Sequence, residues 1–485
     1  MTVVTQPPSG VLPQTKAFVG GEWVDGKSRR PVFDPASGEV IAEVEVAGAE
    51  LCRRAVDAAS AAFGPWSATP PRERAEILRR AFERMTAESE NIARLITREN
   101  GKVLADARGE VAYAAEFFRW FSEEASRLSG DFRMAPAGDK RIVVTHQPVG
   151  VSLLVTPWNF PAAMAARKIA PALAAGCTVI LKPASETPLT ALAVADILQR
   201  AGVPAGVVNV VVAAPTALRV REMLHDPRVT NLSFTGSTEV GVILLHEAAD
   251  QVVRTSMELG GNAPFLVLAG ADVDDAVAGA MVAKLRNGGA ACTAANRFYV
   301  HRSVADAFTT RLADAMRSLM IGPGLDPDSQ IASLVSVEER DKVAALVDAA
   351  VRGGATVVTG AGSPDRAGAF YFPTVLADVD PGADVLTHEI FGPVAPIVVV
   401  DSDEEAIRLA NASPFGLISY VYAGDLRRGM RVADALESGM VAVNRGVVSD
   451  PAAPFGGYKQ SGLGREGGFA GIHEFLESKY IAVDI

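Results

Sequence analysis

The sequence predicts an α/β fold in which parallel sheets are covered by helices on both faces. In residues 151–260, short runs rich in Val, Ile and Leu alternate with segments of helical periodicity. A second section of the same kind follows residue 260. The hydrophobic content of 49% and charged content of 21% are ordinary for a globular protein. Alternating strands and helices of this kind form parallel sheets whose two faces are buried.

The length and charge of the chain limit its organisation and its partners. At 485 residues, the chain is long enough for about three domains of roughly 150 residues each. Its net charge of -11 argues against nucleic acid or an anionic membrane as the main partner, because both require a basic face. Pro161, Arg167 and Lys168 interrupt the most apolar region, so we expect no segment that spans a bilayer. A small molecule is the expected partner.

Cysteine use and the first residues predict the compartment. The three cysteines, Cys52, Cys177 and Cys292, are an odd number without paired spacing. This pattern favours a reducing compartment, the cytosol, and neither a disulfide framework nor a zinc or other metal site. Residues 1–15 contain no basic flank followed by an apolar run. We therefore expect a loose tail there and no signal peptide.

The first third of the chain contains two kinds of segment. Residues 20–45 have short apolar runs separated by Gly, Asp-Pro and Ser-Gly turns, which predicts short strands. Residues 50–124 have apolar residues at helical spacing, and Pro70-Pro71 is placed where a helix begins. Residues 130–149 are polar and predict a projecting hairpin, while residues 480–484 are strand-like. These two pieces could pair with each other or with another subunit, because an exposed edge invites pairing.

The α/β sections place loops where ligands bind. Buried strands are expected at residues 151–155, 178–182, 207–212 and 232–234, with helices at 162–175, 188–201 and 238–249. The second section has expected strands near 264–268, 297–300 and 394–399, and helices near 274–286, 305–319 and 338–352. Ligands bind beyond the carboxyl ends of parallel strands. The expected site therefore includes the loops that follow the first and second strands.

The loop at residues 234–241, Phe-Thr-Gly-Ser-Thr-Glu-Val-Gly, joins a strand to a helix. Free amide protons and the helix dipole at such a junction favour a phosphate group. The loop does not match the common Gly-x-Gly-x-x-Gly fingerprint. By itself it is equally well explained as an ordinary helix cap.

Cys292 is the candidate nucleophile. It follows Gly288 and Gly289, which permit sharp turns that present a side chain to a reactant. A lone cysteine is more often an inert core residue. A reactive thiol also needs a base, an oxyanion donor and an acceptor for the group that leaves. Glu258 is the candidate base and Asn159 the candidate donor.

Lys182 and Glu389 are candidates to bind the ribose hydroxyls or phosphates of a cofactor. Each of these side chains also has a simple structural explanation, such as a surface ion pair or a turn. Together with Cys292, Glu258 and Asn159 they form a fuller set than chance would assemble.

The chain resembles the aldehyde dehydrogenase superfamily from about residue 18 to its C-terminus. The matching motifs are residues 157–161 (Pro-Trp-Asn-Phe-Pro), 182–184 (Lys-Pro-Ala), 234–237 (Phe-Thr-Gly-Ser), 258–261 (Glu-Leu-Gly-Gly), Cys292, 389–393 (Glu-Ile-Phe-Gly-Pro) and 454–457 (Pro-Phe-Gly-Gly). The resemblance implies a Rossmann-like cofactor domain (1–125 and 147–259), an α/β catalytic domain (260–440), and a small β oligomerisation arm with the C-terminal segment (126–146 and 441–485). A homodimer or homotetramer is implied as well.

The resemblance also implies roles for individual residues. Cys292 would attack the aldehyde, Asn159 and the Cys292 backbone amide would hold the oxyanion, hydride would pass to a nicotinamide, and Glu258 would activate the water that cleaves the thioester. The residues expected to bind the dinucleotide are Thr156, Pro157, Trp158, Lys182, Ser185, Gly236, Ser237, Leu259, Glu389 and Phe391. Relatives that prefer NAD tend to carry Glu at the position of Ser185. A carboxylate there would repel a 2′-phosphate, so we expect NADP to be preferred and NAD to remain possible.

Closer similarity to succinate-semialdehyde dehydrogenases lies in residues 444–449 and 453–466. In that subgroup two arginines and a serine hold the substrate carboxylate, which matches Arg167, Arg286 and Ser449 here, with Phe455 as a further substrate residue. Fixed guanidinium groups suit a planar carboxylate. The alternative is that the arginines cap helices or pair with carboxylates of the protein.

Several positions depart from the subgroup pattern. They are Ala290 in place of Gln, Ala294 in place of a second Cys, residues 332–335, Ala213 in place of Gly, and Arg445. These differences bear on the substrate more than on the reaction. An aromatic or aliphatic aldehyde is the alternative substrate. Acyl transfer to coenzyme A is disfavoured by Glu258, and a non-catalytic protein that retains the fold is the alternative of another class.

Overall fold

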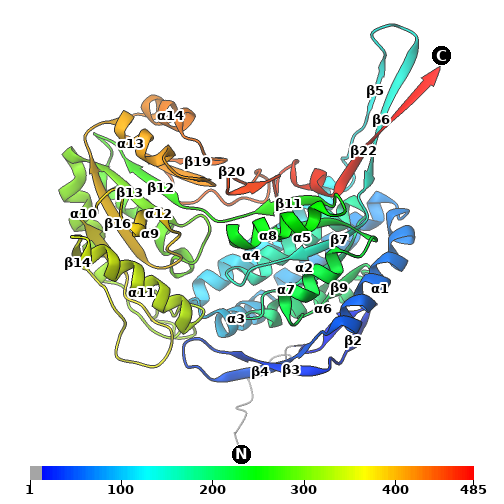
Figure 1. Ribbon diagram of the computed structural model, residues 1–485, viewed down its shortest axis with the longest axis horizontal. Coiled ribbons are helices and arrows are strands. Elements are labelled where there is room, and N and C mark those ends of the chain that lie inside the picture. Colours follow the sequence, from blue (N-terminus) through cyan, green and yellow to red (C-terminus); the bar gives the residue numbers. More distant parts are fainter. Residues whose placement is uncertain (1–13, 485) are drawn as a thin grey trace, which may run out of the picture.

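The computed structural model describes residues 14–484 and is built around two large sheets (Figure 1). The tail expected at residues 1–15 lies outside the described residues except for its last two positions. The eight-stranded sheet contains, in spatial order, β2 (Glu22–Val24), β1 (Ala17–Val19), β9 (Val208–Val210), β8 (Thr178–Lys182), β7 (Val151–Val155), β10 (Val229–Thr235), β11 (Arg254–Glu258) and β21 (Gly462–Leu463). Its central pairs, from β9 to β11, are parallel.

The central strands of this sheet are apolar on both faces because helices cover both. Every residue of β7 and β8 is buried. Leu154 of β7 packs in a cluster with α2 (Pro71–Ala87), α4 (Leu104–Glu124), α5 (Pro161–Ala175) and α6 (Pro188–Ala201). Its neighbour Leu153 packs instead with α1 (Ala49–Ser67), α7 (Thr216–Leu224) and α8 (Thr238–Ala249). Because side chains alternate along a strand, one strand contributes residues to the hydrophobic cores on both faces of the sheet.

The seven-stranded sheet has the same architecture. It contains, in spatial order, β14 (Thr356–Thr359), β15 (Thr374–Ala377), β16 (Val394–Val400), β13 (Ala295–His301), β12 (Ala263–Val267), β18 (Ile418–Tyr422) and β19 (Met440–Val443). Its helices are α9 (Val273–Leu285), α10 (Arg302–Arg317), α11 (Val337–Arg352), α12 (Asp384–Thr387), α13 (Asp403–Asn411) and α14 (Leu426–Ala435). The pairs from β15 through β16, β13, β12 and β18 to β19 are parallel. The predicted α/β fold with two parallel-sheet sections is confirmed.

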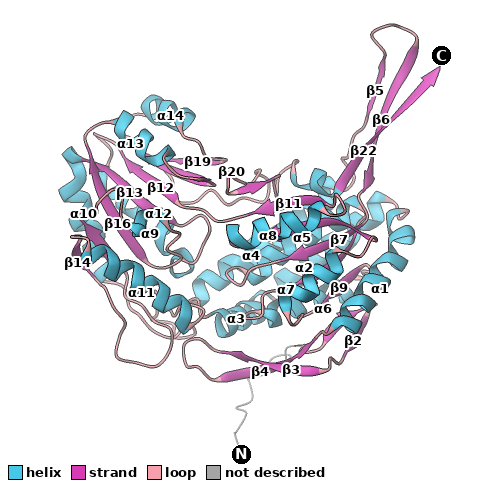
Figure 2. Ribbon diagram, in the orientation of Figure 1, coloured by secondary structure: helices cyan, strands magenta, loops and turns pink. Residues whose placement is uncertain are grey.

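A three-stranded antiparallel sheet projects from the body (Figure 2). It consists of β5 (Asp131–Met134), β6 (Lys140–Pro148) and β22 (Leu476–Asp484), and Tyr480 of β22 pairs with Val144 of β6. The two alternatives left open by the sequence are thereby decided, because the hairpin and the C-terminal strand pair within one chain. Phe132, Tyr480 and Ile481 are exposed on this sheet.

The C-terminal segment reaches further than the arm. Strand β21 lies at the edge of the eight-stranded sheet, where Leu463 pairs with Met257 of β11. The division of the chain into domains at the boundaries given above stays a prediction.

Two further elements of the first half are α3 (Ser89–Asn100) and the antiparallel pair β3 (Ser28–Phe33) and β4 (Val40–Val46). Within residues 14–484, no helix is long and apolar enough to cross a membrane.

The structure corrects some element boundaries. Strand β10 begins at Val229, earlier than residue 232, because the polar Asn231 obscures the apolar run although it is buried and donates a hydrogen bond to Ser152. Helix α7 was not expected. Its sequence, Thr-Ala-Leu-Arg-Val-Arg-Glu-Met-Leu, buries only one narrow side, which gives a weak periodic signal in so short a segment.

Candidate active site

A cavity of about 290 Å³ lies at the carboxyl ends of β7, β10 and β11 and faces the second sheet. The residues that line it are Pro157, Trp158, Asn159, Met164, Thr235, Gly236, Ser237, Leu259, Gly260, Cys292, Glu339, Lys342, Glu389 and Phe391. Most of the catalytic and cofactor residues expected from the sequence are therefore brought together. The reason is topological, because parallel strands place the loops that follow them at one edge of the sheet. Met164, Glu339 and Lys342 were not expected.

The walls of this cavity suit a dinucleotide. Lys182, at the end of β8, does not line this cavity, but it is a buried residue, and no hydrogen bond or ion pair of its amine appears within residues 14–484. Burial lowers the pKa of Lys182 to about 8. Thr235 Oγ1 is buried without a hydrogen-bond partner in the same range. Buried polar groups normally have partners, so Thr235 Oγ1 fits a ligand with hydroxyl groups, while the Lys182 amine is not engaged by another side chain.

The opposite wall carries a carboxyl group and two rings. Glu389 Oε1 accepts a hydrogen bond from the Gly261 amide at 3.3 Å. Burial raises the pKa of Glu389 to about 8. Trp158 and Phe391 meet edge to face with 5.3 Å between ring centroids. Ser237 caps α8 by accepting from the Val240 amide at 3.4 Å.

Cys292 is partly exposed and lines the cavity. It follows a turn at Arg286–Gly289 in which Asn287 and Gly288 have φ of 55° and 61°. A Cβ at Gly289 would come within 2.2 Å of the Gly392 carbonyl oxygen, so only glycine fits there. Burial raises the pKa of Cys292 to about 12, while the charge of Arg167 acts in the opposite direction. In the ligand-free protein the sulfur is therefore a thiol at neutral pH.

Glu258 is buried at the end of β11, and neither of its carboxyl oxygens has a hydrogen-bond partner within residues 14–484. Burial, and next the charge of Glu466, raise the pKa of Glu258 well above its ordinary value. A buried carboxyl group whose pKa is raised is a stronger base than an ordinary carboxylate, which suits general base catalysis.

Glu466 and Lys168 are residues that the sequence analysis missed. Both are buried, and Lys168 Nζ lies 2.5 Å from Glu466 Oε1. The charges of Arg167 and Lys168 outweigh burial and lower the pKa of Glu466. The signal available in the sequence was the pair Arg167-Lys168 inside an otherwise apolar helix, since a buried cation needs an anionic partner.

A second cavity of about 570 Å³ holds two of the four expected substrate residues, Arg286 and Ser449. Arg286 Nη1 donates to Ser449 Oγ at 3.2 Å, and the guanidinium lies 4.9 Å from the centroid of the Phe160 ring. Asp106 and Tyr113 of α4 line the same cavity. A positive group beside a hydroxyl at the wall of a cavity suits a carboxylate ligand.

Arg167 and Phe455, the other two expected substrate residues, line neither cavity. Arg167 forms a buried ion pair with Glu466 and lies 4.2 Å from the centroid of the Phe455 ring. Arg167 was expected to bind the substrate carboxylate, with pairing to a carboxylate of the protein as the alternative. The structure shows the alternative for Arg167. Its Nη2 is buried without a hydrogen-bond partner within residues 14–484.

The comparisons with known proteins agree with this geometry. The model of the aldehyde dehydrogenase family matches residues 23–481. The chain belongs to the aldehyde dehydrogenase family. It is accordingly an NAD(P)-dependent oxidoreductase that acts on aldehydes, and the family and reaction expected from the motifs are confirmed.

Three relatives share about half of their residues with this aldehyde dehydrogenase. A succinate-semialdehyde dehydrogenase of Paenarthrobacter nicotinovorans is 54% identical over 92% of this chain and 99% of its own. A succinate-semialdehyde dehydrogenase of Escherichia coli, named for NADP(+), is 47% identical over 97% and 98%. A glutarate-semialdehyde dehydrogenase of Pseudomonas putida is 47% identical over 97% and 98%.

The solved structures give the same result. A crystal structure of a succinate-semialdehyde dehydrogenase from Burkholderia pseudomallei has a TM-score of 0.96 and 46% sequence identity, and the match covers 98% of each chain. The expected aldehyde dehydrogenase fold is confirmed.

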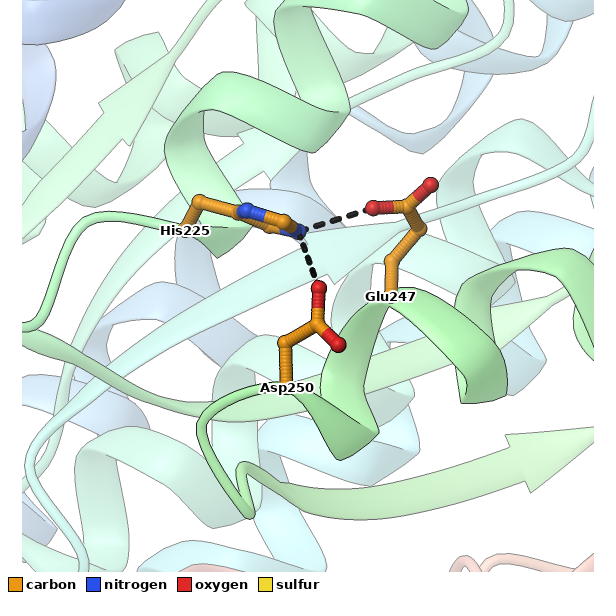
Figure 3. Close-up of side chains that lie close together, drawn as sticks. All are labelled: His225, Glu247 and Asp250. Atoms are coloured by element: carbon orange, nitrogen blue, oxygen red, sulfur yellow. Dashed lines mark hydrogen bonds and ion pairs between the residues drawn. The ribbon is translucent and has the colours of Figure 1, made fainter.

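A third group of polar side chains lies at the ends of α7 and α8 (Figure 3), and none of its members lines either cavity. His225 Nε2 lies 2.8 Å from Glu247 Oε2 and 3.8 Å from Asp250 Oδ2. Arg221 Nε lies 2.9 Å from the same Glu247 oxygen. Because the Arg221 guanidinium already forms an ion pair with the Glu247 carboxylate, we interpret the group as a polar cluster that joins the two helices. We assign no metal to it.

Proposed function

We propose that this enzyme oxidises succinate semialdehyde to succinate. The observation that carries the proposal is the contact between Arg286 and Ser449 in the cavity next to the Cys292 turn. A guanidinium and a hydroxyl fixed there would bind the carboxylate at the far end of a short semialdehyde. The names of the relatives in Paenarthrobacter nicotinovorans and Escherichia coli support the same substrate.

Three residues would divide the chemistry: Cys292 and Asn159, which line the cavity, and Glu258, which does not. Cys292 Sγ, after its proton has passed to solvent water, adds to the aldehyde carbon, and the carbonyl electron pair moves to oxygen. Asn159 Nδ2 and the Cys292 amide would hold this oxyanion. The bound dinucleotide supplies a hydride acceptor. Glu258 then takes a proton from the water that attacks the thioester, which releases the acid and the thiol.

We propose that the binding residues of the cofactor are those expected from the sequence, with Lys182 and Glu389 holding ribose hydroxyls and Thr156, Gly236, Ser237 and Leu259 beside them. Trp158, Pro157 and Phe391 would bound the nicotinamide end. These assignments are supported by the cavity that the other residues share and by the unpartnered Thr235 side chain, whereas Thr156 and Lys182 do not line the cavity.

NADP is the proposed preferred cofactor because Ser185, half-buried after β8, presents no negative charge to a 2′-phosphate. Replacing Ser185 by Glu is expected to lower kcat/KM for NADP by about 100-fold relative to NAD, because a like-charge contact costs several kcal/mol. Initial rates with both cofactors at matched concentrations measure this ratio. Ser185→Gln, of similar size without charge, is the control, and an equal loss in both variants would contradict an electrostatic role for this position.

The raised pKa of Glu258 predicts a pH dependence. The carboxylate form is the base, and burial raises its pKa, so kcat is expected to fall as Glu258 is protonated, at a higher pH than for an ordinary carboxyl group, and to rise as Glu258 loses its proton. In Glu258→Gln, kcat should drop by about 100-fold or more. That variant should also release one equivalent of reduced cofactor in a burst, because thioester formation does not need this base. A rising pH limb retained in Glu258→Gln without a burst would contradict the assignment.

Glutarate semialdehyde, one methylene longer, is the second candidate, because the Pseudomonas putida relative is named for it. Both substrates place a carboxylate opposite an aldehyde. Comparing kcat/KM for succinate semialdehyde, glutarate semialdehyde, hexanal and benzaldehyde with each cofactor tests the proposal. Succinate semialdehyde is expected to give the highest value, and a higher value for hexanal or benzaldehyde would overturn the proposal in favour of an aliphatic or aromatic aldehyde.

We infer that the enzyme is a homodimer or homotetramer assembled through the arm sheet. The apolar side chains exposed there, Phe132, Tyr480 and Ile481, support this, because a patch of this kind on an edge favours association. Light scattering on the purified protein measures the number of subunits, and a monomer would refute it. The cytosolic location expected from the cysteines stays a prediction.

A further inference from the structure

Three charged side chains around the start of α4 contact both loops that carry the proposed oxyanion donors. Lys102 precedes the helix, and Asp106 and Glu110 follow at intervals of four residues. Residues four apart lie on one face of a helix. The loop at residues 157–160 carries Asn159, and the turn at Arg286–Gly289 leads to Cys292.

Lys102 holds the Asn159 loop by its main chain. Its Nζ donates to the Asn159 carbonyl oxygen at 2.7 Å and lies 4.2 Å from the centroid of the Phe160 ring. The same amine forms an ion pair with Glu110 Oε2 at 2.6 Å, and both side chains are almost fully buried. A buried cation with fixed partners leaves the peptide that it binds little freedom to move.

Glu110 extends the contact to the helix that follows Asn159. Its Oε1 accepts hydrogen bonds from the amides of Ala162 and Ala163 at 2.8 and 3.3 Å. These are free amides in the first turn of α5. Glu110 therefore joins the Lys102 amine to the start of α5, so that the chain is held at Asn159 and in the helical turn that follows it.

Asp106 holds the other loop. Its Oδ2 accepts from the Asn287 amide at 2.8 Å, where Asn287 has the left-handed conformation with φ of 55°. The Asn287 side chain in turn donates to the carbonyl oxygens of Asn159 and Ala290 at 2.8 and 2.9 Å. The Asn159 carbonyl is thus the atom at which contacts from α4 and from the Cys292 turn meet.

We propose that Lys102, Asp106 and Glu110 are positioning residues. They set the distance between the two oxyanion donors, the side-chain amide of Asn159 and the backbone amide of Cys292. The inference rests on the proposed roles of Asn159 and Cys292. An oxyanion is stabilised only when both donors reach it at hydrogen-bond distance, and a displacement of about 1 Å can lower a rate by about 100-fold. None of the three lines the cavity that contains Cys292, whereas Asp106 and Glu110 line the second cavity, which contains Arg286.

An aliphatic trifluoromethyl ketone provides the test, because Cys292 Sγ adds to its carbonyl carbon and the electron pair moves to oxygen, which gives a stable oxyanion. In Lys102→Met and Asp106→Ala, the dissociation constant of this adduct is expected to rise by about 10-fold to 100-fold. In Asp106→Asn, which keeps an oxygen acceptor for the Asn287 amide, affinity should return to within about threefold of the wild type.

Two further measurements separate positioning from general damage. Alkylation of Cys292 by iodoacetamide forms no oxyanion, so its rate should stay within about twofold of the wild type, as should the dissociation constant of NADP. Glu99→Gln is the matched control, since Glu99 is a buried carboxyl group that accepts from the Leu189 and Thr190 amides at the start of α6. Its ketone affinity should be unchanged.

Unchanged ketone affinity in both Lys102→Met and Asp106→Ala would overturn the proposal, and so would a parallel loss of ketone affinity and alkylation rate. If Lys102→Met does not fold, the comparison of Asp106→Ala with Asp106→Asn decides. The proposed substrate is tested independently, by comparing aldehydes with the wild-type enzyme. The ketone is uncharged, so its affinity reports only on the oxyanion site.

Discussion

Replacing Cys292 by Ala is expected to lower aldehyde oxidation by at least about 10⁴-fold, because without the sulfur no covalent intermediate forms. Dinucleotide binding should remain, since the cavity walls that suit the cofactor are contributed by Glu389 and the loops that follow β7 and β10. Steady-state rates and fluorescence titration with the reduced cofactor measure the two properties on the same preparation.

Cys52→Ala is the matched control for this prediction. Cys52 is buried on α1, and burial raises its pKa to about 11. Its removal should leave kcat within about twofold of the wild type, apart from a modest loss of stability. Turnover retained by Cys292→Ala would refute the role of this thiol, and loss of cofactor binding together with turnover would indicate a collapsed site.

Replacing Arg286 by Leu is expected to lower kcat/KM for succinate semialdehyde by about 100-fold or more, because removing one partner of a charge pair costs about 2–5 kcal/mol. For hexanal, which has no carboxylate, kcat/KM should change by less than about threefold, since an uncharged chain makes no ion pair with the guanidinium. The ratio of the two values is the measurement, and it is independent of the amount of active enzyme. Ser449→Ala should shift the same ratio in the same direction by a smaller factor, about 10-fold.

Arg311→Leu is the control for the loss of an arginine. Arg311 lies on α10, where its side chain is half exposed and pairs with Asp274 on the surface, so neither substrate should be affected. An equal loss for both aldehydes in Arg286→Leu would show that Arg286 supports the fold of the cavity and does not select the carboxylate. In that case Arg167, whose Nη2 has no hydrogen-bond partner within residues 14–484, would be the next candidate.

The net positive charge near Cys292 is smaller than Arg167 and Arg286 would give without their partners. Glu466 is the ion-pair partner of both Arg167 and Lys168. Arg286 differs from Arg167 because its side-chain partner is the Ser449 hydroxyl and not a carboxylate. It is also partly exposed in its cavity. We therefore expect a single substrate carboxylate to be held mainly by Arg286 and Ser449.

The amino-acid order by itself determined the α/β class, most of the strands and helices, and the motifs that place this chain among the aldehyde dehydrogenases. These depend on local periodicity and on short stretches around Asn159, Glu258 and Cys292, so each can be recognised without knowing what lies nearby in space. The pairing of the hairpin with the chain end was expected only as one of two alternatives.

Only the tertiary structure decided which charges are paired and which are free. Glu466 lies 299 positions from Arg167, and Lys102 lies 57 positions from Asn159, distances at which no periodic pattern links two residues. The pKa values of Cys292 and Glu258 were likewise set by burial between two sheets, because desolvation depends on everything that surrounds a group and not on its neighbours in the chain.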